Sequence, residues 1–241
     1  LETTSPDAVF HLAAQPLVRE SYLDPRTTME TNVMGTFNVI EAISAVPSIQ
    51  ASVIITTDKV YRNVNQIQGY IESDPLGGHD PYSASKAMAD ILTQSWMLSF
   101  PGSPMAIARA GNVIGGGDVC QDRLMPDLMR GFSEGSDVSL RYPEAVRPWQ
   151  HVLDCLTGYQ LLMQELVAHN PTILQQPTWN FGPGPANFKT VGEVADLATK
   201  LWGSPASWSV PTQTHPHEAE LLALDATAAR QKLGWADRLD F

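Results

Sequence analysis

The sequence has 241 residues, 43% of them hydrophobic and 17% charged, which is the composition of an ordinary globular protein and excludes disordered and coiled-coil chains. Its formal net charge of −11 argues against a nucleic-acid or polybasic membrane surface, because phosphate binding needs clustered cations. Two cysteines, no apolar run of roughly 18 residues and no signal-like start indicate a cytoplasmic protein. The first residue is Leu1, and we expect this start to be a cut.

Short apolar runs alternate with helical patterns in the first half of the chain. We predict a buried strand over residues 8–13, a helix from Asp24 to about residue 46, and a second strand over 52–57. Asp24 is a good N-cap, and Pro25 follows it at the first helical position. A second amphipathic helix over 81–100 and a third strand over 105–110 complete two strand-helix-strand passes. This alternation predicts a parallel sheet.

Beyond residue 118 the pattern loosens into helices and one short strand. We expect helices at about 123–133, 151–168, 190–202 and 225–233, and a strand at 178–181. The predicted fold is therefore α/β, a doubly wound parallel sheet of Rossmann type with a smaller mixed α/β lobe. We assign residues 1–117 to the sheet, with 150–181 returning to it, and residues 118–149 and 182–241 to the lobe.

The most informative pair of residues is Tyr82 and Lys86, at the start of the 81–100 helix. Residues four apart share one helical face, so the Lys86 ammonium can lie near the Tyr82 phenol. A nearby cation lowers the pKa of a phenol, which suits it to general acid-base chemistry.

A second polar set, Thr56-Thr57-Asp58-Lys59, follows the 52–57 strand, and small residues, Ala13 and Ala14, follow the 8–13 strand. Ligands of open α/β sheets bind outside the carboxyl ends of the strands, so these groups converge on one site.

These residues resemble the extended short-chain dehydrogenase/reductase superfamily, in its epimerase/dehydratase family. Within it, the sequence is most similar to the CDP-glucose 4,6-dehydratases. The stretches that carry the resemblance are residues 11–15, 56–63, 74–86, 110–115, 147–153 and 217–225.

The resemblance implies an NAD-dependent hydro-lyase, used in deoxysugar biosynthesis, that oxidises the sugar at C4, eliminates water across C5 and C6, and returns the hydride to C6. Tyr82 would take the 4-hydroxyl proton, helped by Lys86 and by Thr57, which would hydrogen-bond the hydroxyl. Asp58 would protonate the departing 6-hydroxyl. The resemblance also implies NAD contacts from Leu12, Ala13, Ala14, Thr31, Thr56, Tyr82 and Lys86.

Lys59 departs from the dehydratases of dTDP-glucose, which carry Glu beside the Asp. A lysine removes a proton only when it is neutral, and otherwise positions a water or stabilises an enolate. We hypothesise that Lys59 assists at C5.

The substrate contacts that the resemblance implies are largely cationic. Guanidinium groups suit the oxygens of a diphosphate. The residues expected here are Gln15, Arg19, Asn112, Arg123, Arg141 and Arg147. A surface role for Arg141 is an equal alternative. The resemblance also implies a homodimer or a dimer of dimers, through the helices at 25–46 and 82–100.

Two further features bear on ligands. The sequence has no glycine fingerprint between a strand and a helix, so we expect the opening βα units of the cofactor domain to be absent. His215 and His217 are a weak metal signal, and we expect no metal. The alternatives are a related dehydratase or epimerase, and a chain that binds a sugar nucleotide without turnover.

Overall fold

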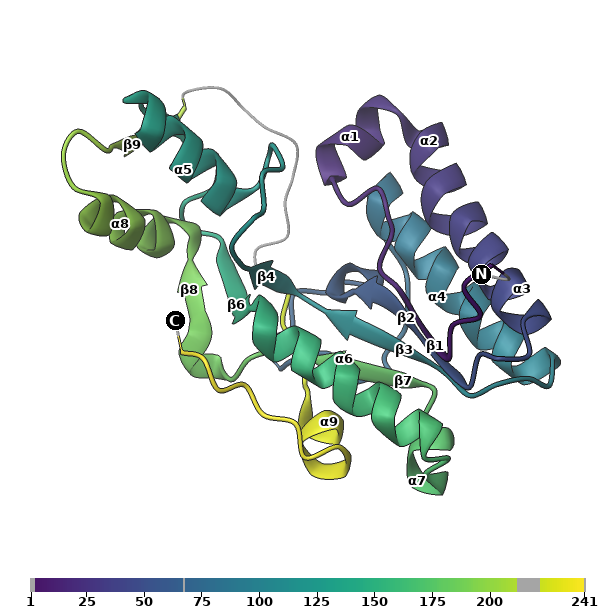
Figure 1. The fold of residues 1–241 in the computed structure, drawn as a ribbon. Coiled ribbons are helices and arrows are strands. Elements are labelled where there is room, and N and C mark those ends of the chain that lie inside the picture. Colours follow the sequence, from purple (N-terminus) through teal and green to yellow (C-terminus); the bar gives the residue numbers. More distant parts are fainter. Residues whose placement is uncertain (1–2, 67, 212–221, 241) are drawn as a thin grey trace.

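The computed structural model describes residues 3–66, 68–211 and 222–240, and its centre is a parallel sheet. Figure 1 shows the four strands side by side, with the neighbouring order β1-β2-β3-β7. All three neighbouring pairs are parallel. The strands are β1 (Ala8–His11), β2 (Ala51–Thr57), β3 (Met105–Ala110) and β7 (Thr178–Phe181).

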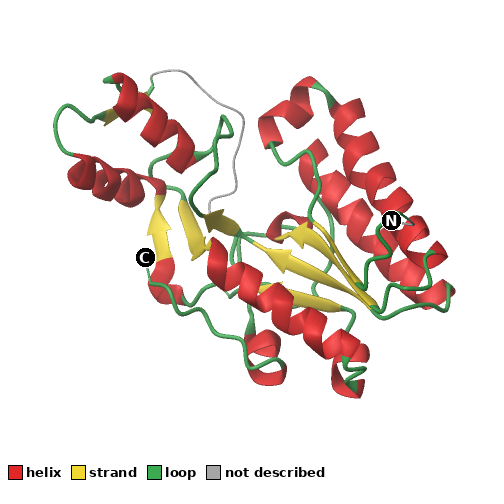
Figure 2. Cartoon of the chain, viewed as in Figure 1, coloured by secondary structure: helices red, strands yellow, loops and turns green. Residues whose placement is uncertain are grey.

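Helices cover both faces of this sheet, as Figures 1 and 2 show. The helix α3 (Gly35–Ala45) lies on one face, where Ile54 packs with Ile40 and Ile43. The helix α6 (Val152–Val167) lies on the other face, where Val53 packs with Leu162. Adjacent residues of a strand point to opposite faces, so Val53 and Ile54 must both be apolar. The predicted doubly wound α/β sheet is confirmed.

The chain between β1 and β2 is mostly helical. It forms α1 (Val18–Leu23), α2 (Pro25–Met29), a π-helical turn η1 (Glu30–Met34) and α3. The Asp24 carboxylate accepts a hydrogen bond from the Thr27 N–H at 2.9 Å, as its place before Pro25 predicts. The helix predicted to about residue 46 therefore forms, with one widened turn in it.

After β2 the chain makes a short 3-10 turn, η2 (Asp58–Val60), and a long loop that leads to α4 (Pro81–Ser99). Asp80 caps α4 by accepting a hydrogen bond from the Ser83 N–H at 2.8 Å. This helix packs against α3 and β2. The amino end of α4 therefore lies beside the carboxyl end of β2.

The remaining strands form two smaller sheets. One contains β4 (Asn112–Ile114), β6 (Val146–His151) and β8 (Phe188–Thr190), and the other pairs β5 (Val138–Ser139) with β9 (Trp208–Ser209). The helices α5 (Leu124–Glu134) and α8 (Val191–Trp202) pack together through Leu128, Phe132 and Ala195. This cluster is separate from the core of the main sheet. Figure 1 shows α5 and α8 side by side, away from that sheet.

Three short helices complete the described chain: α7 (Pro171–Leu174), the 3-10 turn η3 (Pro185–Asn187) and α9 (Thr227–Lys232). Beyond α9, Trp235 is buried against Phe181 in the main core, with ring centroids 5.4 Å apart. No helix in the described ranges is long and apolar enough to cross a membrane.

Candidate functional site

The predicted catalytic residues meet where β2 ends and α4 begins. Tyr82 is the second residue of α4 and is 9% exposed. Its backbone N–H donates to the Ser21 hydroxyl at 3.1 Å, which connects the start of α4 to α1. The Tyr82 phenol forms a hydrogen bond with the Thr57 side chain, at the last position of β2. The structure therefore brings Thr57 and Tyr82 together.

Lys86 lies one turn further along α4 and is 4% exposed. Its Nζ donates to the backbone carbonyl of Ile55 at 2.9 Å, which fastens α4 to β2. Burial lowers the pKa of Lys86 to about 8, against an opposing effect of the Asp90 carboxylate. The pKa of Lys86 therefore lies only slightly above neutral pH.

The Tyr82 phenol has a higher pKa than the sequence suggests. Burial and, to a smaller extent, the Asp58 charge raise this pKa to about 12, although the Thr57 hydrogen bond and the Arg123 charge oppose the rise. The lowering of the Tyr82 pKa expected from Lys86 is therefore not seen in the chain alone, because burial outweighs the groups that lower it.

Asp58 is the most unusual carboxylate of the site. It is 1% exposed, and its Oδ1 accepts a hydrogen bond from Thr57 Oγ1 at 2.8 Å. Its Oδ2 is also buried but has no hydrogen-bond partner among the described residues. Gly111 lies beside it, since a Cβ there would be 3.2 Å from this oxygen. A buried carboxylate oxygen without a partner is costly, which indicates a position reserved for a ligand.

Lys59 lies at the solvent-facing edge of the same cluster of polar side chains. Its side chain is 33% exposed, and its Nζ is 3.6 Å from Asp58 Oδ1. Its backbone N–H also donates to Thr57 Oγ1 at 3.4 Å. The ammonium is thus near Asp58 while it keeps contact with solvent.

The predicted cofactor residues divide into two groups. Leu12 and Ala13 follow β1 and are exposed, and Ala14 is half-buried, so small side chains leave this strand end accessible. Thr31 is exposed on the η1 turn. The Thr56 hydroxyl, in contrast, donates to Asp90 Oδ2 at 3.0 Å in the interior. The Thr56 hydroxyl therefore makes a hydrogen bond inside the protein in place of the contact with NAD that was predicted for this residue.

The Gln15 side chain also forms hydrogen bonds within the protein. Its Nε2 donates to Leu17 O at 3.1 Å and to Thr28 Oγ1 at 2.9 Å, and its Oε1 accepts from the Leu17 N–H. Both ends of the amide are engaged within the chain, so we drop the substrate contact predicted for it. Asn32, which the sequence reasoning missed, bonds to the Gln15 backbone through both ends of its own amide.

Three of the residues predicted to bind the diphosphate, Arg19, Arg123 and Arg141, lie on segments that contact one another. Arg19 on α1 and Arg141 both approach Asp122 Oδ1, at 2.6 and 3.9 Å. Arg123 reaches toward Pro16 O at 3.5 Å, and its charge acts on Tyr82. These contacts connect the segment before α5 to the loop after β1.

Two further predicted contacts lie on β6 and β4. Arg147 is the second residue of β6, and its Nη1 donates to Val146 O at 2.9 Å. Asn112 begins β4, directly after Gly111, and its Oδ1 is buried without a hydrogen-bond partner in the part of the chain that the structure describes. This amide oxygen is therefore a second buried polar atom beside Asp58.

The sequence reasoning missed an ion pair directly behind the site. Arg109 on β3 binds Asp90 on α4, with Nη2 2.8 Å from Oδ1, and both side chains are almost fully buried. An Arg in the strand 105–110, among apolar residues, is the signal that could have revealed it, because a buried Arg needs a partner.

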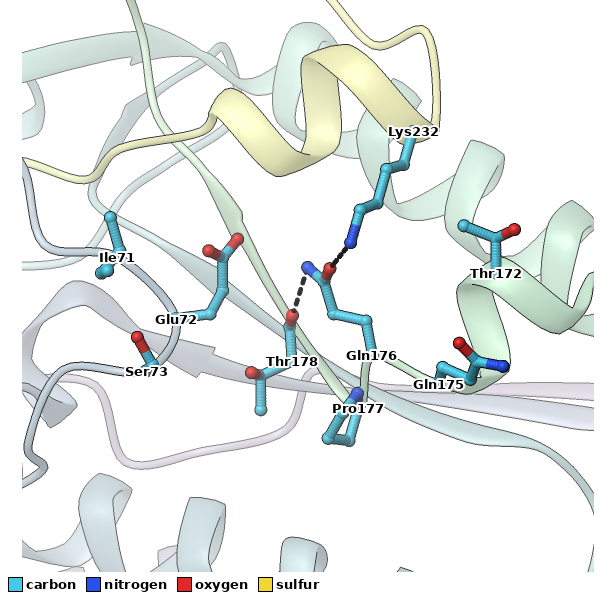
Figure 3. Close-up of a pocket in the computed structure, with 9 residues that line it drawn as sticks. All are labelled: Ile71, Glu72, Ser73, Thr172, Gln175, Gln176, Pro177, Thr178 and Lys232. Atoms are coloured by element: carbon cyan, nitrogen blue, oxygen red, sulfur yellow. Dashed lines mark hydrogen bonds between the residues drawn. The ribbon is translucent and has the colours of Figure 1, made fainter.

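Two surface cavities among the described residues lie away from the polar site. One, of about 500 Å³, lies between the loop at residues 71–73 and the start of β7, and Figure 3 shows Gln176 in it between Thr178 and Lys232. A second, of about 630 Å³, lies between the same loop and α4. Neither is lined by Tyr82 or Asp58.

Metal ligands were not expected. Within residues 3–66, 68–211 and 222–240, no group of three or more His, Cys, Asp or Glu side chains is arranged to hold a metal ion. His215 and His217, the weak metal signal of the sequence, lie outside the described residues.

Comparison with known proteins decides the family. The family model described as GDP-mannose 4,6 dehydratase matches residues 1–241. This chain belongs to the GDP-mannose 4,6-dehydratase family. It is 45% identical, over 97% of its length, to CDP-glucose 4,6-dehydratase from Salmonella typhimurium, of which it covers 67%. It is 29% identical to dTDP-glucose 4,6-dehydratase from Streptomyces griseus, of which it covers 68%. A member of this family is a hydro-lyase that acts on nucleotide sugars, so the predicted enzyme class is confirmed.

Solved structures of other proteins have the same fold as this chain. The chain matches UDP-glucuronic acid 4-epimerase from Bacillus cereus, in complex with UDP-glucuronic acid and NAD, with a TM-score of 0.86 and 20% identity over 99% of this chain and 73% of the epimerase. It matches dTDP-glucose 4,6-dehydratase from Streptomyces venezuelae, with NAD bound, with a TM-score of 0.83 and 24% identity over 98% and 69%. These matches confirm the Rossmann-type fold.

Proposed function

We propose that this member of the GDP-mannose 4,6-dehydratase family dehydrates CDP-glucose to CDP-4-dehydro-6-deoxyglucose, with NAD as the cofactor. The observation that carries the proposal is the Asp58 carboxylate, buried and with one oxygen unpartnered, beside the Tyr82 phenol. Elimination of water needs an acid at C6 in addition to the tyrosine that oxidation at C4 uses, and Asp58 supplies it. The 45% identity to a CDP-glucose 4,6-dehydratase supports the choice of nucleotide.

The residues present fit a nicotinamide cofactor. An ammonium has three N–H donors, and the Lys86 Nζ places one on Ile55 O, so it can offer others to the hydroxyls of a ribose. Ala13 and Ala14 leave the end of β1 accessible to a flat ligand. Bound NAD would accept the hydride from C4 and return it to C6. Thr31 remains a proposed contact on the exposed side.

Tyr82 takes the proton of the 4-hydroxyl in this proposal. With a pKa near 12 the phenol holds its own proton in the chain alone, so catalysis needs added positive charge. Arg123 already acts in this direction, and an oxidised nicotinamide ring is itself cationic. Thr57, which contacts Tyr82, orients the hydroxyl between them.

Asp58 and Lys59 act in the elimination. Asp58 protonates the 6-hydroxyl as it departs, and its unpartnered Oδ2 is the atom offered to the substrate. Lys59, with its ammonium 3.6 Å from Asp58, assists at C5 by stabilising the enolate or by positioning the base.

The sugar nucleotide lies between the main sheet and the lobe built on α5 and α8 in this proposal. Arg123, Arg141 and Arg147 hold the diphosphate, because they carry charge on the lobe side of Tyr82 and Asp58, and Asn112 offers an amide. Arg19 would exchange Asp122 for a phosphate oxygen.

The assembly we propose is a homodimer through the helical segments at 25–46 and 82–100, or a dimer of such dimers. Several large apolar side chains are exposed on this side, which is more than a monomer needs there. They are Met34, Met88, Ile91, Leu98 and Phe100.

Substrate comparison tests the proposed function. The purified protein, expressed at its full natural length, would be incubated with NAD and with CDP-glucose, dTDP-glucose or UDP-glucose in separate reactions. We expect the alkaline absorbance of a 4-keto sugar with CDP-glucose, at least tenfold faster than with the others. A faster reaction with another nucleotide would move the proposal to that substrate, and an epimer without a keto group would refute dehydration.

A further inference from the structure

The ion pair between Asp90 and Arg109 lies behind the proposed site and is almost completely shielded from solvent. Arg109 Nε donates to Asp90 Oδ2 at 2.9 Å and Nη2 donates to Oδ1 at 2.8 Å, and the two side chains are 0–1% exposed. A buried ion pair often stabilises a protein no more than apolar residues of the same shape. The pair therefore calls for a role beyond stability.

The Asp90 carboxylate is fixed by four donors. Besides Arg109, Thr56 Oγ1 donates to Oδ2 at 3.0 Å, and Gln94 Nε2 donates to Oδ1 at 2.7 Å. Arg109 is fixed in turn, since its Nη1 donates to the Tyr61 hydroxyl at 2.7 Å and its guanidinium lies 4.9 Å from the Tyr61 ring centroid. A carboxylate with this many donors keeps its charge and its position.

Asp90 also connects this network to Lys86 through its position on α4. Asp90 follows Lys86 by four residues on α4, so both face β2. They bond to adjacent residues of that strand, Lys86 to the Ile55 carbonyl and Asp90 to the Thr56 hydroxyl. The charge of Asp90 acts directly on the Lys86 ammonium.

The other titratable groups around Lys86 do not replace Asp90. His11 on β1 interacts with Lys86, but burial and that cation lower the pKa of His11, which keeps it neutral. Tyr82 on the same helix is a neutral phenol, because burial raises its pKa to about 12. Arg109 on β3 is a cation. Asp90 is therefore the anion that acts on Lys86 from within this group.

We propose that Asp90, held by Arg109, is a positioning residue that keeps Lys86 cationic at neutral pH. This rests on the proposed function, in which the Lys86 ammonium donates to the ribose hydroxyls of the cofactor. A purely structural ion pair predicts something else: its loss would lower the folded fraction and leave the behaviour of Lys86 unchanged.

The experiment measures the titration of Lys86 directly. Protein labelled with ¹³C at lysine Cε would be titrated by NMR, and the resonance absent from Lys86→Met would be assigned to Lys86. The test variant is Asp90→Asn combined with Arg109→Gln, which removes both charges and retains hydrogen-bonding groups. The control is Asp127→Asn with Arg130→Gln, which removes an ion pair on α5.

We expect the Lys86 midpoint to fall by about one pH unit or more in the test variant, a tenfold change in its proton equilibrium, and to stay within 0.3 units in the control. An unchanged midpoint in a folded test variant would overturn the proposal. If the test variant does not fold, the unmodified protein decides: a Lys86 midpoint near 8 supports the proposal, and one below 6.5 overturns it.

Activity provides the second readout. In the holoenzyme with CDP-glucose, the alkaline limb of the kcat profile should move to lower pH in the test variant, with less than a twofold loss at pH 6 and about a fivefold or greater loss at pH 8. A uniform loss at all pH values would contradict the proposal. If the unmodified protein dehydrates no sugar, the proposed function fails, whereas the NMR titration still tests the effect of Asp90 on Lys86.

Discussion

Lys86 Nζ donates a hydrogen bond to the backbone carbonyl of Ile55 at 2.9 Å, in the interior between α4 and β2. This contact fixes the helix that carries Tyr82 against the strand that ends in Thr57 and Asp58. The catalytic groups of two elements, remote in sequence, are thereby held in one arrangement.

Removal of the Lys86 charge should stabilise the fold and abolish activity. In Lys86→Met the buried ammonium is gone, so the free energy of unfolding at pH 7 should rise by about 1–3 kcal/mol. Because folding lowers the lysine pKa from 10.5 to about 8, the unfolded wild-type chain holds the extra proton between these values, and wild-type stability recovers there.

Chemical denaturation at pH 7 and pH 10.5 measures the difference between Lys86→Met and the wild type. We expect it to be largest below pH 8 and to disappear near pH 10.5. A difference that does not depend on pH would show that Lys86 is not charged and desolvated in the fold.

Tyr82→Phe removes the acid-base group and retains the ring. We expect kcat to fall by about 10²–10⁴-fold, with binding of CDP-glucose changed less than threefold. Calorimetric binding together with the keto-sugar assay checks both. Activity above a tenth of the wild type would contradict the role of the phenol.

Asp58 and Lys59 should affect elimination rather than oxidation. With Asp58→Asn, reduced cofactor should accumulate in a single turnover, because C4 is oxidised but the 6-hydroxyl leaves slowly. With Lys59→Met, exchange of the C5 hydrogen with deuterated solvent should slow. Exchange at the wild-type rate in Lys59→Met would remove Lys59 from the mechanism.

Gly111 should be sensitive to a single methyl group. A Cβ at this position would lie 3.2 Å from Asp58 Oδ2 and 3.6 Å from the Pro148 ring, so Gly111→Ala must displace the carboxylate. We expect kcat to fall about tenfold while the fold is retained. Gly116→Ala is the matched control, because its Cβ would meet nothing within 4 Å. Equal activity of the two variants would contradict a fixed Asp58.

Much of the fold was predictable because burial follows simple patterns. Val53, Ile54 and Ile55 make β2 apolar on both faces at its centre, which is typical of a parallel sheet covered on both sides. β6 was missed because Pro148 lies in its centre and breaks the strand pattern. β4 was missed because it has three residues. The short α1 follows Leu17, which makes no side-chain cap, so its start has no sequence signal.

Contacts within the site could be predicted only where the spacing of the residues along the chain determines them. Tyr82 and Lys86 are four residues apart on one helix, so their proximity follows from the period of the helix. The contact between Asp90 and Arg109 depends on how α4 packs on β3, and no spacing along the chain encodes it. The engagement of Gln15 with Thr28 likewise depends on how the loop after β1 folds back.

Transfer of a deuterium label tests the central claim most directly. The protein at its full natural length, with NAD, would be given CDP-glucose deuterated at C4, and the product would be examined by mass spectrometry and NMR. If Tyr82, Lys86 and Asp58 act as proposed, the product has lost one water, carries a keto group at C4 and holds the deuterium at C6. Product that keeps all its oxygen atoms and bears deuterium at C4 would contradict dehydration at this site.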